Sequence, residues 1–468
     1  MKFALTLAVV LAVLWCVYAL WFDPRRGTDD KAWETGEPAT LALEATLTNA
    51  QAQEDLDFLL KRVAERHPAA YGGLPPEVQA QYDEEIRALG SEVSVLEVYR
   101  ASARILTTLH DSHTGISTLG AQSRQLPQGF SFSWEGGELI LAEASYAGGT
   151  DIVIGGVRQA ERYAQYKGRK VALLAGVSPP ELYERYKTVF PVEMEAYGQA
   201  QFALIIRYEE YLELLGAEPL ETNGLPVLFE GDAEPVDLPL SSPVSGDDAD
   251  GSGDSGGDPA ANPSFYYELD EAASLGILTV EACEMSQAYK DTLRDFFAAV
   301  RDRGIRNVAL DLRGNGGGTT EVIGEFMRYM PVESYDTNTF YARYGPLRLH
   351  INGNGQKNKM AGDLVFTGRL FVLTNVWTWS SATNFAAYLK YNSLAEIVGA
   401  QSGNDQVYGH ILCFQLPHSR LMMTVSCKAY YLGGEPGNAA WTVPDHPCPA
   451  SEAMDKVREL IASGNHAA

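Results

Sequence analysis

Apolar residues in the first third of the chain recur at helical spacing. Leu56, Leu59 and Val63 follow one another at intervals of three or four residues, and apolar positions between 86 and 99 are spaced in a similar way. Such a recurrence places apolar side chains along one face of a helix, where they pack against a core. Residues 40–116 are therefore predicted to form a small helical domain.

The pattern changes to alternation after this helical domain. Phe130, Phe132 and Trp134 alternate with serine, which is the spacing of a half-buried strand. The run 168–177 resembles the core of a PDZ module, a kind of domain that binds a peptide by adding it as a strand to a sheet edge. We therefore predict a PDZ-like, β-rich segment over 125–215, with a helix at its end over 202–215.

Strands and helices alternate in the C-terminal half. The apolar strand 275–280 is followed by the amphipathic helix 286–303 and the strand 308–312, which predicts a parallel crossover unit. The alternation continues with helices at 321–329 and 382–391, with strands at 370–373 and 397–399, with a hairpin over 408–426 and with a last helix over 451–461. The sequence therefore predicts an α/β domain over 264–462.

A low-complexity segment precedes the α/β domain. Residues 241–263 are rich in glycine, serine and aspartate and contain almost no large apolar side chains. Such a composition cannot form a core. The segment is predicted to be an acidic, solvated linker.

Two of the predicted strands end in stretches that carry chemistry. The strand 308–312 runs into the glycine-rich turn 314–318, whose bare backbone N–H groups are suited to a negative charge. The strand 370–373 leads to Ser380 and Ser381 at the predicted start of a helix. A helix N-terminus is where a serine nucleophile and its developing oxyanion are well stabilised. We expect the two stretches to meet.

These stretches also carry a family resemblance. The strand end DLRGNGGG at 311–318, followed by the turn TWSSA at 378–382, resembles the tail-specific, or C-terminal-processing, serine peptidases, the family that includes the tricorn protease core. The resemblance implies a ClpP/crotonase-like fold for the α/β domain. It also implies that Ser380, which directly follows the Thr-aromatic pair, is the nucleophile, with an oxyanion hole formed by the N–H of Ser381 and by Gly316 and Gly317.

The same resemblance points to a histidine base. The family has an Asp-x-His-Thr motif after its helical domain, and His113 occupies the matching position, with Ser112 and Asp111 in supporting roles. Members with a Ser-Lys dyad have a lysine 25 residues after the serine, where this chain has Asp405. A Ser-His mechanism is therefore expected.

The third member of the triad is left open between two residues. The resemblance places a carboxylate ahead of a Pro-Asp signature, which is matched here by Val443-Pro444-Asp445. Asn438 stands six residues before Pro444, and Glu435 stands nine before it. An asparagine orients an imidazole by accepting its N–H, whereas a carboxylate also stabilises the imidazolium.

The net charge of the chain limits the classes of molecule that it can bind. The chain has 468 residues and a net charge of -25, which repels nucleic acid, so nucleic-acid binding is excluded and a peptide or protein substrate is expected. No cofactor is expected. His110, Asp111 and His113 suggest a metal, but no further ligand at helical or strand spacing completes the set, so no metal site is predicted.

The N-terminus predicts export. Residues 1–22 contain a long, nearly uninterrupted apolar run behind Lys2, which is typical of a signal peptide or a membrane anchor. The protein is therefore expected to be extracytoplasmic, either secreted or tethered to the cell membrane. Cys413 and Cys427 lie on two apparent strands that flank a turn, and both a cross-strand disulfide and buried thiols are compatible with the pattern.

Taken as a whole, the sequence predicts an exported serine endopeptidase. Two alternatives remain open. One is a non-catalytic member that binds peptides or hydrophobic ligands, because the same fold serves the interphotoreceptor retinoid-binding proteins and Asn438 departs from the family pattern. The other is a zinc hydrolase built on His110 and His113. The oligomeric state cannot be predicted from the sequence.

Overall fold

The computed structural model describes residues 11, 25–119, 123–145, 153–154, 157–218, 220, 222–241, 264–344 and 347–464. The predicted leader and the predicted acidic linker lie outside the described residues, except at positions 11 and 241. Among the helices in the described part of the chain, none has the length and apolar character needed to span a membrane.

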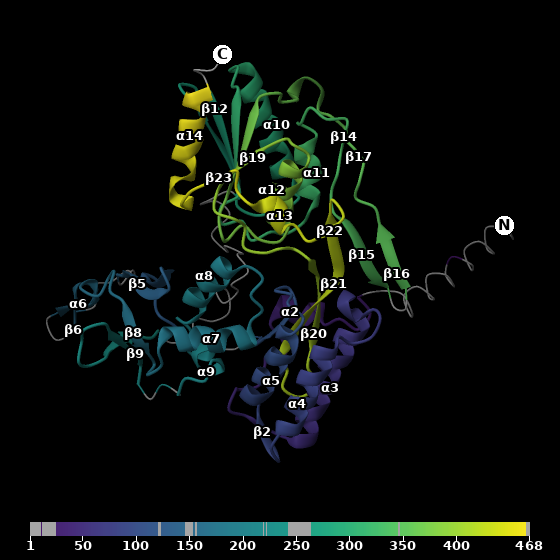
Figure 1. The fold of residues 1–468 in the computed structure, drawn as a ribbon. Helices are drawn as coiled ribbons and strands as arrows, with labels where there is room; N and C mark the ends of the chain where they lie inside the picture. The colour runs from purple at the N-terminus through teal and green to yellow at the C-terminus, as the bar shows by residue number, and fades with distance from the viewer. Residues whose placement is uncertain are drawn as a thin grey trace. The chain divides into compact units, whose positions relative to one another are not determined.

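The chain divides into two compact units. Figure 1 colours the chain by residue number, from purple at the N-terminus to yellow at the C-terminus. The first comprises Met1–Asp248 together with His410–Ser426, and the second comprises Ala249–Gly409 and Cys427–Ala468. A hairpin of the C-terminal half therefore belongs to the N-terminal unit.

Helices dominate the start of the first unit. The short helix α2 (Asp30–Thr35) precedes α3 (Asn49–Arg66), the 3-10 turn η2 (Pro68–Ala70), α4 (Pro76–Ala88) and α5 (Val95–Thr107). A capping box begins each of the two helices α3 and α5, with Thr48 and Ser94 at the N-caps. These N-caps end the paired strands β1 (Thr46–Thr48) and β2 (Glu92–Ser94), so one small ladder fixes where both helices start.

The apolar faces predicted from the helical spacing are buried. Leu56, Leu59 and Val63 have no exposed surface. Burying an aliphatic side chain of this size contributes about 1.5–3 kcal/mol to folding, which is where most of the stability of such short helices originates.

The remainder of the first unit mixes strands and helices. Its elements are β3 (Gly115–Ser117), β4 (Phe130–Glu135), β5 (Glu138–Ala144), β6 (Val153–Ile154), β7 (Val157–Arg158), α6 (Gln159–Ala164), β8 (Val171–Leu174), α7 (Pro179–Val189), α8 (Glu195–Ile205), α9 (Glu209–Leu214), β9 (Gly224–Phe229) and β10 (Val236–Pro239). The strands β4 and β5 form a hairpin, and β10, β9 and β8 form an antiparallel sheet.

One predicted helix of this region is wrong. The helix expected over 202–215 is interrupted between α8 and α9. The carbonyl of Arg207 accepts a hydrogen bond from Leu126 N–H (3.0 Å), and Glu209 N–H donates to the carbonyl of Arg124 (3.0 Å). These backbone groups are therefore used by a segment far away in sequence, which local spacing does not reveal.

A six-stranded sheet forms the second unit, as predicted. Its order is β11-β12-β13-β18-β19-β23, with bounds Phe265–Asp270, Leu275–Val280, Asn307–Asp311, Arg369–Thr374, Glu396–Gly399 and His446–Pro447. All neighbours pair in parallel except β11, which is antiparallel to β12. The crossover from β12 to β13 contains α10 (Gln287–Asp302), so the predicted parallel unit is confirmed.

Helices cover both faces of this sheet (Figure 1). Val308 and Leu310 of β13 pack with α10, α11 (Glu321–Met327) and α12 (Ser381–Tyr391). Ala309, the residue between them, packs with α14 (Ala453–Gly464) on the other face. A continuous apolar strand is required here because both of its faces are buried.

The remaining elements of the second unit are β14 (Ser334–Tyr335), β15 (Thr339–Tyr344), β16 (Leu347–Ile351), β17 (Gln356–Lys357), the 3-10 turn η3 (Gly362–Leu364), β22 (Glu435–Pro436), α13 (Ala439–Thr442) and the 3-10 turn η4 (Ala450–Glu452). The strands β15 and β16 form a hairpin that the sequence analysis missed, although Leu347, Leu349 and Ile351 alternate with polar residues in β16.

The hairpin of β20 (Tyr408–Gln415) and β21 (Met422–Leu432) is predicted correctly. Its tip is fixed by Asp55 of α3, a buried carboxylate that accepts hydrogen bonds from the backbone N–H groups of His418 and Ser419, both at 2.8 Å. The segment Met422–Thr424 pairs with β3. The four cysteines of the described residues, including Cys413 and Cys427, form no disulfide, which decides between the two readings of the sequence.

Candidate active site

The glycine-rich turn at the end of β13 depends on its glycines. A Cβ atom on Gly318 would lie 2.3 Å from the carbonyl oxygen of Cys283, and Gly317 has a φ of +105°. Within the turn, Asn315 Nδ2 donates to the carbonyl of Val280 (2.8 Å), while Asn315 Oδ1 accepts from the N–H of Gly317 (2.9 Å). The turn is therefore held rigidly against the neighbouring strand β12.

Ser380 lies directly against this turn. A Cβ atom on Gly317 would come within 2.7 Å of Ser380 Cβ, and the N–H of Trp379 donates to the carbonyl of Asn315 at 2.9 Å. The two sequence stretches therefore meet, as predicted. Both lie within the second unit.

The backbone of Ser380 is strained. Ser380 is the N-cap of α12 and has φ +53° and ψ −119°, a combination that side-chain-bearing residues rarely adopt. A serine on a sharp strand-to-helix turn in such a conformation is the arrangement of a nucleophile elbow, which presents the hydroxyl away from the backbone. Strain of this kind costs about 1–3 kcal/mol and persists only where the surroundings enforce it.

Asn404 enforces part of this geometry. Its side-chain oxygen accepts hydrogen bonds from the N–H of Ser380 and from Thr383 Oγ1, both at 2.8 Å, and the side chain is fully buried. Its amide donates to Gln406 Oε1 at 2.9 Å. The sequence analysis missed Asn404, because nothing in the local pattern around it indicates a contact with the serine turn.

Three backbone N–H groups are available for an anion here. Those of Gly316, Gly318 and Ser381 donate to no group among the described residues. The N–H of Gly317, one of the predicted oxyanion donors, is instead used by Asn315. The hydroxyl of Ser381 donates to the carbonyl of Gly318 at 2.6 Å, so this side chain ties the helix start to the turn.

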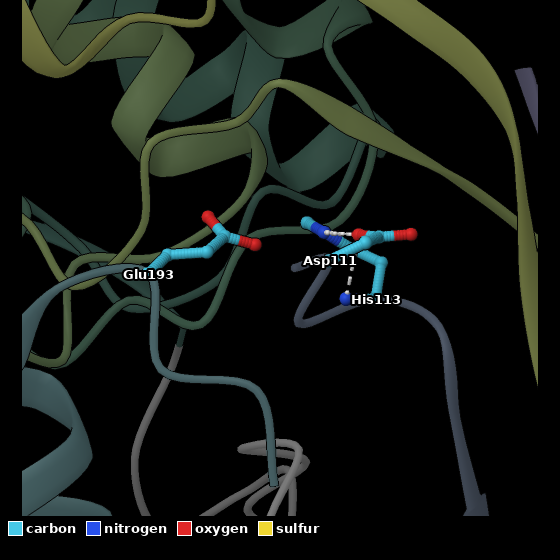
Figure 2. Close-up of side chains that lie close together, drawn as sticks. All are labelled: Asp111, His113 and Glu193. Atoms are coloured by element: carbon cyan, nitrogen blue, oxygen red, sulfur yellow. Dashed lines mark hydrogen bonds and ion pairs between the residues drawn. The ribbon is translucent and has the colours of Figure 1, made fainter. Parts of the chain in front are cut away.

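The predicted base lies in the first unit. His113 is 8% exposed and follows the fully buried Asp111 in the turn after α5 (Figure 2). Asp111 Oδ1 accepts from the backbone N–H of His113 at 3.0 Å and lies 3.8 Å from His113 Nδ1. Thr424 Oγ1 donates to the carbonyl of His113 at 2.9 Å. The backbone of His113 is thus held by its own turn and by the hairpin strand β21.

Burial and charge act on these two groups in opposite directions. Burial lowers the pKa of His113, while the negative charge of Asp111 raises it, and the net direction is downward. Burial alone would raise the pKa of Asp111, but hydrogen bonds from His67 and Thr114, with the charges of His67 and His113, bring it to about 2. Asp111 is therefore a carboxylate at neutral pH, and the ring of His113 is neutral there.

His67 supports Asp111 from the other side. Its Nε2 lies 3.2 Å from Asp111 Oδ2, and its Nδ1 accepts the N–H of Ala69 at 3.2 Å. A ring that accepts at Nδ1 carries its proton on Nε2, so a neutral His67 donates to the carboxylate. The sequence analysis missed His67, which follows α3 and lies far along the chain from the motif around His113.

A second carboxylate reaches the same turn. Glu193 Oε1 accepts from both the N–H (2.7 Å) and the hydroxyl (2.6 Å) of Ser112. Figure 2 shows its side chain pointing toward His113 from the loop between α7 and α8. The sequence analysis missed Glu193, because it lies far along the chain from the histidine and carries no motif.

The two candidates for the third triad position lie in the second unit. Asn438 is fully buried, and its amide nitrogen donates to Asn384 Oδ1. Its backbone N–H donates to Asp405 Oδ1 at 3.0 Å. Glu435 is exposed in β22. Asn438 is therefore hydrogen-bonded to Asn384, a buried side chain of α12.

Comparison with known proteins defines the class. Residues 274–436 match the model of peptidase family S41. The matched segment contains β13, the glycine turn, Ser380 and Asn404, and its similarity to this family of serine-type peptidases agrees with the sequence prediction. The comparison with curated proteins gave no match.

Solved structures show the same fold over most of the chain. Mature CPAF in complex with lactacystin is similar with a TM-score of 0.60 and 11% identity, over 88% of this chain and 98% of that chain. A mutant form of CPAF is similar with a TM-score of 0.62 and 12% identity, over 89% of this chain and 97% of that chain. The chain therefore has a mixed helix and sheet architecture similar to that of CPAF.

Proposed function

We propose that the protein is an exported serine endopeptidase that hydrolyses peptide bonds of protein substrates, with Ser380 as nucleophile and His113 as general base. The observation that carries the proposal is the strained backbone of Ser380 at the start of α12, directly against a turn with unused N–H groups. Strain of this kind clusters at catalytic positions, where it is part of the mechanism.

The chemistry follows from these groups. Nε2 of a neutral His113 accepts the proton of Ser380 Oγ while the oxygen attacks the scissile carbonyl. The N–H groups of Gly316, Gly318 and Ser381 are suited to stabilise the oxyanion, and Gly317 serves by its shape. His113 then returns the proton to the leaving amine, and water hydrolyses the acyl-enzyme in a second cycle. The lowered pKa of His113 keeps the ring ready to accept a proton at neutral pH.

Asp111 is the best-supported partner of the imidazole. Its carboxylate faces His113 Nδ1, whereas the amide of Asn438 donates to Asn384 and Glu435 is exposed. Asp111 Oδ1 is 3.8 Å from Nδ1, so its negative charge favours the tautomer that has its proton on Nδ1, which leaves Nε2 as the acceptor. We therefore expect Asp111→Asn to lower kcat far more than Asn438→Ala or Glu435→Gln. A large loss of kcat in Glu435→Gln would instead show that Glu435 orients the imidazole.

Several finer features belong to the same proposal. The parallel sheet β12-β13-β18-β19 supports a ClpP/crotonase-like fold for the α/β domain, and the β4–β5 hairpin with the β8–β10 sheet supports a PDZ-like module. The apolar run of residues 3–22 supports export, by a cleaved signal or a membrane tether.

The decisive experiment compares two adjacent serines. Labelling by a fluorophosphonate probe and hydrolysis of an unfolded protein substrate should be lost in Ser380→Ala. In Ser381→Ala both should be weakened only, because its backbone N–H remains. Labelling that survives in Ser380→Ala and disappears in Ser381→Ala would assign the nucleophile to Ser381.

A second candidate function is supported by Asn438. Its position, six residues before Pro444, is where the family resemblance implies a carboxylate, and here it is a buried amide bonded to another amide. A member that has lost its triad would bind peptides or hydrophobic ligands without cleaving them. A folded wild-type chain that neither reacts with the fluorophosphonate nor cleaves protein would favour this function.

A further inference from the structure

Three metal-ligating side chains converge in the first unit. Asp111, His113 and Glu193 each offer one ligand atom, and these atoms lie within 4.8 Å of one another (Figure 2). Two of the three are buried, and Glu193 is half-buried, so the cluster differs from the acidic groups that are common on a protein surface. His110, which the sequence suggested as a ligand, is exposed and does not belong to the cluster.

The spacing of the donors fits a small divalent cation. Two ligands that are each about 2.1 Å from the same zinc ion are at most about 4.2 Å apart. The 3.8 Å between His113 Nδ1 and Asp111 Oδ1 already meets this condition. The widest pair needs a shift of about 0.6 Å, which is within reach of a half-buried Glu193 side chain in a loop.

The donor set selects the metal. One imidazole nitrogen and two carboxylates are ligands for zinc, whereas calcium and magnesium prefer oxygen alone. Three protein ligands leave a fourth position open, as in exchangeable zinc sites rather than closed structural ones. Asp111 accepts hydrogen bonds from His67 and Thr114, and His67 supports it as an outer partner of the kind that orients metal ligands.

We propose that Asp111, His113 and Glu193 form a regulatory zinc site that switches off the peptidase. The inference rests on the proposed function of His113. A neutral imidazole that binds zinc through Nδ1 carries its single proton on Nε2. Nε2 is then a donor, so it cannot take the proton of the serine. When zinc binds, the proton on Nδ1 leaves to solvent and Nε2 takes up one proton from solvent, so the ring keeps a single proton and stays neutral.

Glu193 separates this site from the catalytic groups. Asp111 and His113 serve both the base and the metal, whereas Glu193 serves the metal and accepts two hydrogen bonds from Ser112 at Oε1. Withdrawing the Glu193 carboxylate should therefore weaken zinc binding while the imidazole and its Asp111 partner stay in place.

Binding is tested directly by calorimetric titration of zinc chloride into the untagged, EDTA-treated full chain. We expect one zinc ion per wild-type chain, and an affinity at least about tenfold weaker for Glu193→Gln and for Glu193→Asp, which shortens the side chain by one methylene. Glu396→Gln is the matched control. Glu396 also lies next to a histidine, 2.8 Å from His446, but among the described residues no third metal-ligating side chain completes a site there. Its affinity should equal that of the wild type. Melting curves confirm that each variant is folded.

The inhibitory part has its own readout. Zinc should suppress fluorophosphonate labelling of the wild type, EDTA should restore it, and Glu193→Gln should need about tenfold more zinc for the same suppression. A wild type that binds no zinc, or Glu193 variants that bind it as tightly as the wild type, would overturn the site. Zinc binding in a chain without any labelling would instead overturn the peptidase proposal and leave the metal site standing.

Discussion

Gly317 and Ser380 approach each other so closely that no side chain fits between them. A Cβ atom on Gly317 would lie 2.7 Å from Ser380 Cβ, 2.9 Å from the carbonyl oxygen of Trp379 and 3.0 Å from the nitrogen of Ser381. Two of these three atoms are backbone, so relieving the clash would move the start of α12. The glycine is therefore a steric requirement of the serine turn.

Replacing this glycine should disable the serine. We expect Gly317→Ala to abolish fluorophosphonate labelling, because the methyl group displaces Ser380 and the new residue has to adopt a φ of +105°. Gly355→Ala is the control, since Gly355 also has a positive φ (+67°) but would meet nothing within 4 Å. Equal labelling of both variants would show that the contact with Ser380 is dispensable.

Asn404 should be needed both for activity and for stability. In Asn404→Ala the N–H of Ser380 and the hydroxyl of Thr383 lose their shared acceptor, and a buried donor left without a partner costs about 1–3 kcal/mol. We therefore expect a lower melting temperature and slower fluorophosphonate labelling. Asn354→Ala changes an exposed asparagine and should alter neither. A fully active Asn404→Ala would mean that α12 and the glycine turn alone hold the serine.

His67 should contribute to the stability of the first unit through its contact with Asp111. His67→Ala removes the hydrogen bond that a neutral His67 donates to the buried Asp111 carboxylate, and such a bond to a charged group contributes about 1.5–3 kcal/mol. The free energy of unfolding from urea titration measures this cost. The control is His418→Ala, because His418 pairs with Glu54 at the surface, where such a pair is worth about 0–1 kcal/mol. Similar losses in the two variants would contradict the buried interaction.

Glu210 should make stability depend on pH. Burial raises its pKa, the hydrogen bond from Thr118 lowers it and the neighbouring Glu213 raises it, so the folded state holds the proton more tightly than the unfolded state. The stabilisation is complete below the ordinary pKa of a glutamate, and it is lost as the pH rises through the folded-state value.

Glu210→Gln should remove this dependence, because a glutamine keeps the oxygen that accepts from Thr118 and carries no charge. We expect the variant to gain melting temperature relative to the wild type at pH 7 and to lose that gain at pH 4. The exposed Glu84→Gln should show the same difference at both pH values. A gain that is independent of pH would show that ionisation of Glu210 is not its cause.

The predictable parts of the molecule are those whose signal is local. The strands β12 and β13 and the helices α3 and α10 carry their burial pattern in their own spacing. The serine turn was predicted because it joins an apolar strand to a helix, while the choice of Ser380 over Ser381 rests on the family resemblance. Asn404 and Glu193 were missed for the opposite reason. Each acts on a residue that is distant in sequence, and an isolated asparagine or glutamate looks the same on a surface as in a site. The helix over 202–215 was wrong because Arg124 and Leu126 use its backbone groups.

The assignment of residues 410–426 to the first unit has a consequence for synthesis of the chain. Strand β3 pairs with Met422–Thr424, and the buried Asp55 receives its two N–H donors from His418 and Ser419. A nascent chain that stops before these residues has made every helix of the first unit but cannot complete its hydrogen bonds. The N-terminal unit, with His113 in it, therefore becomes complete only after the serine turn has already been made.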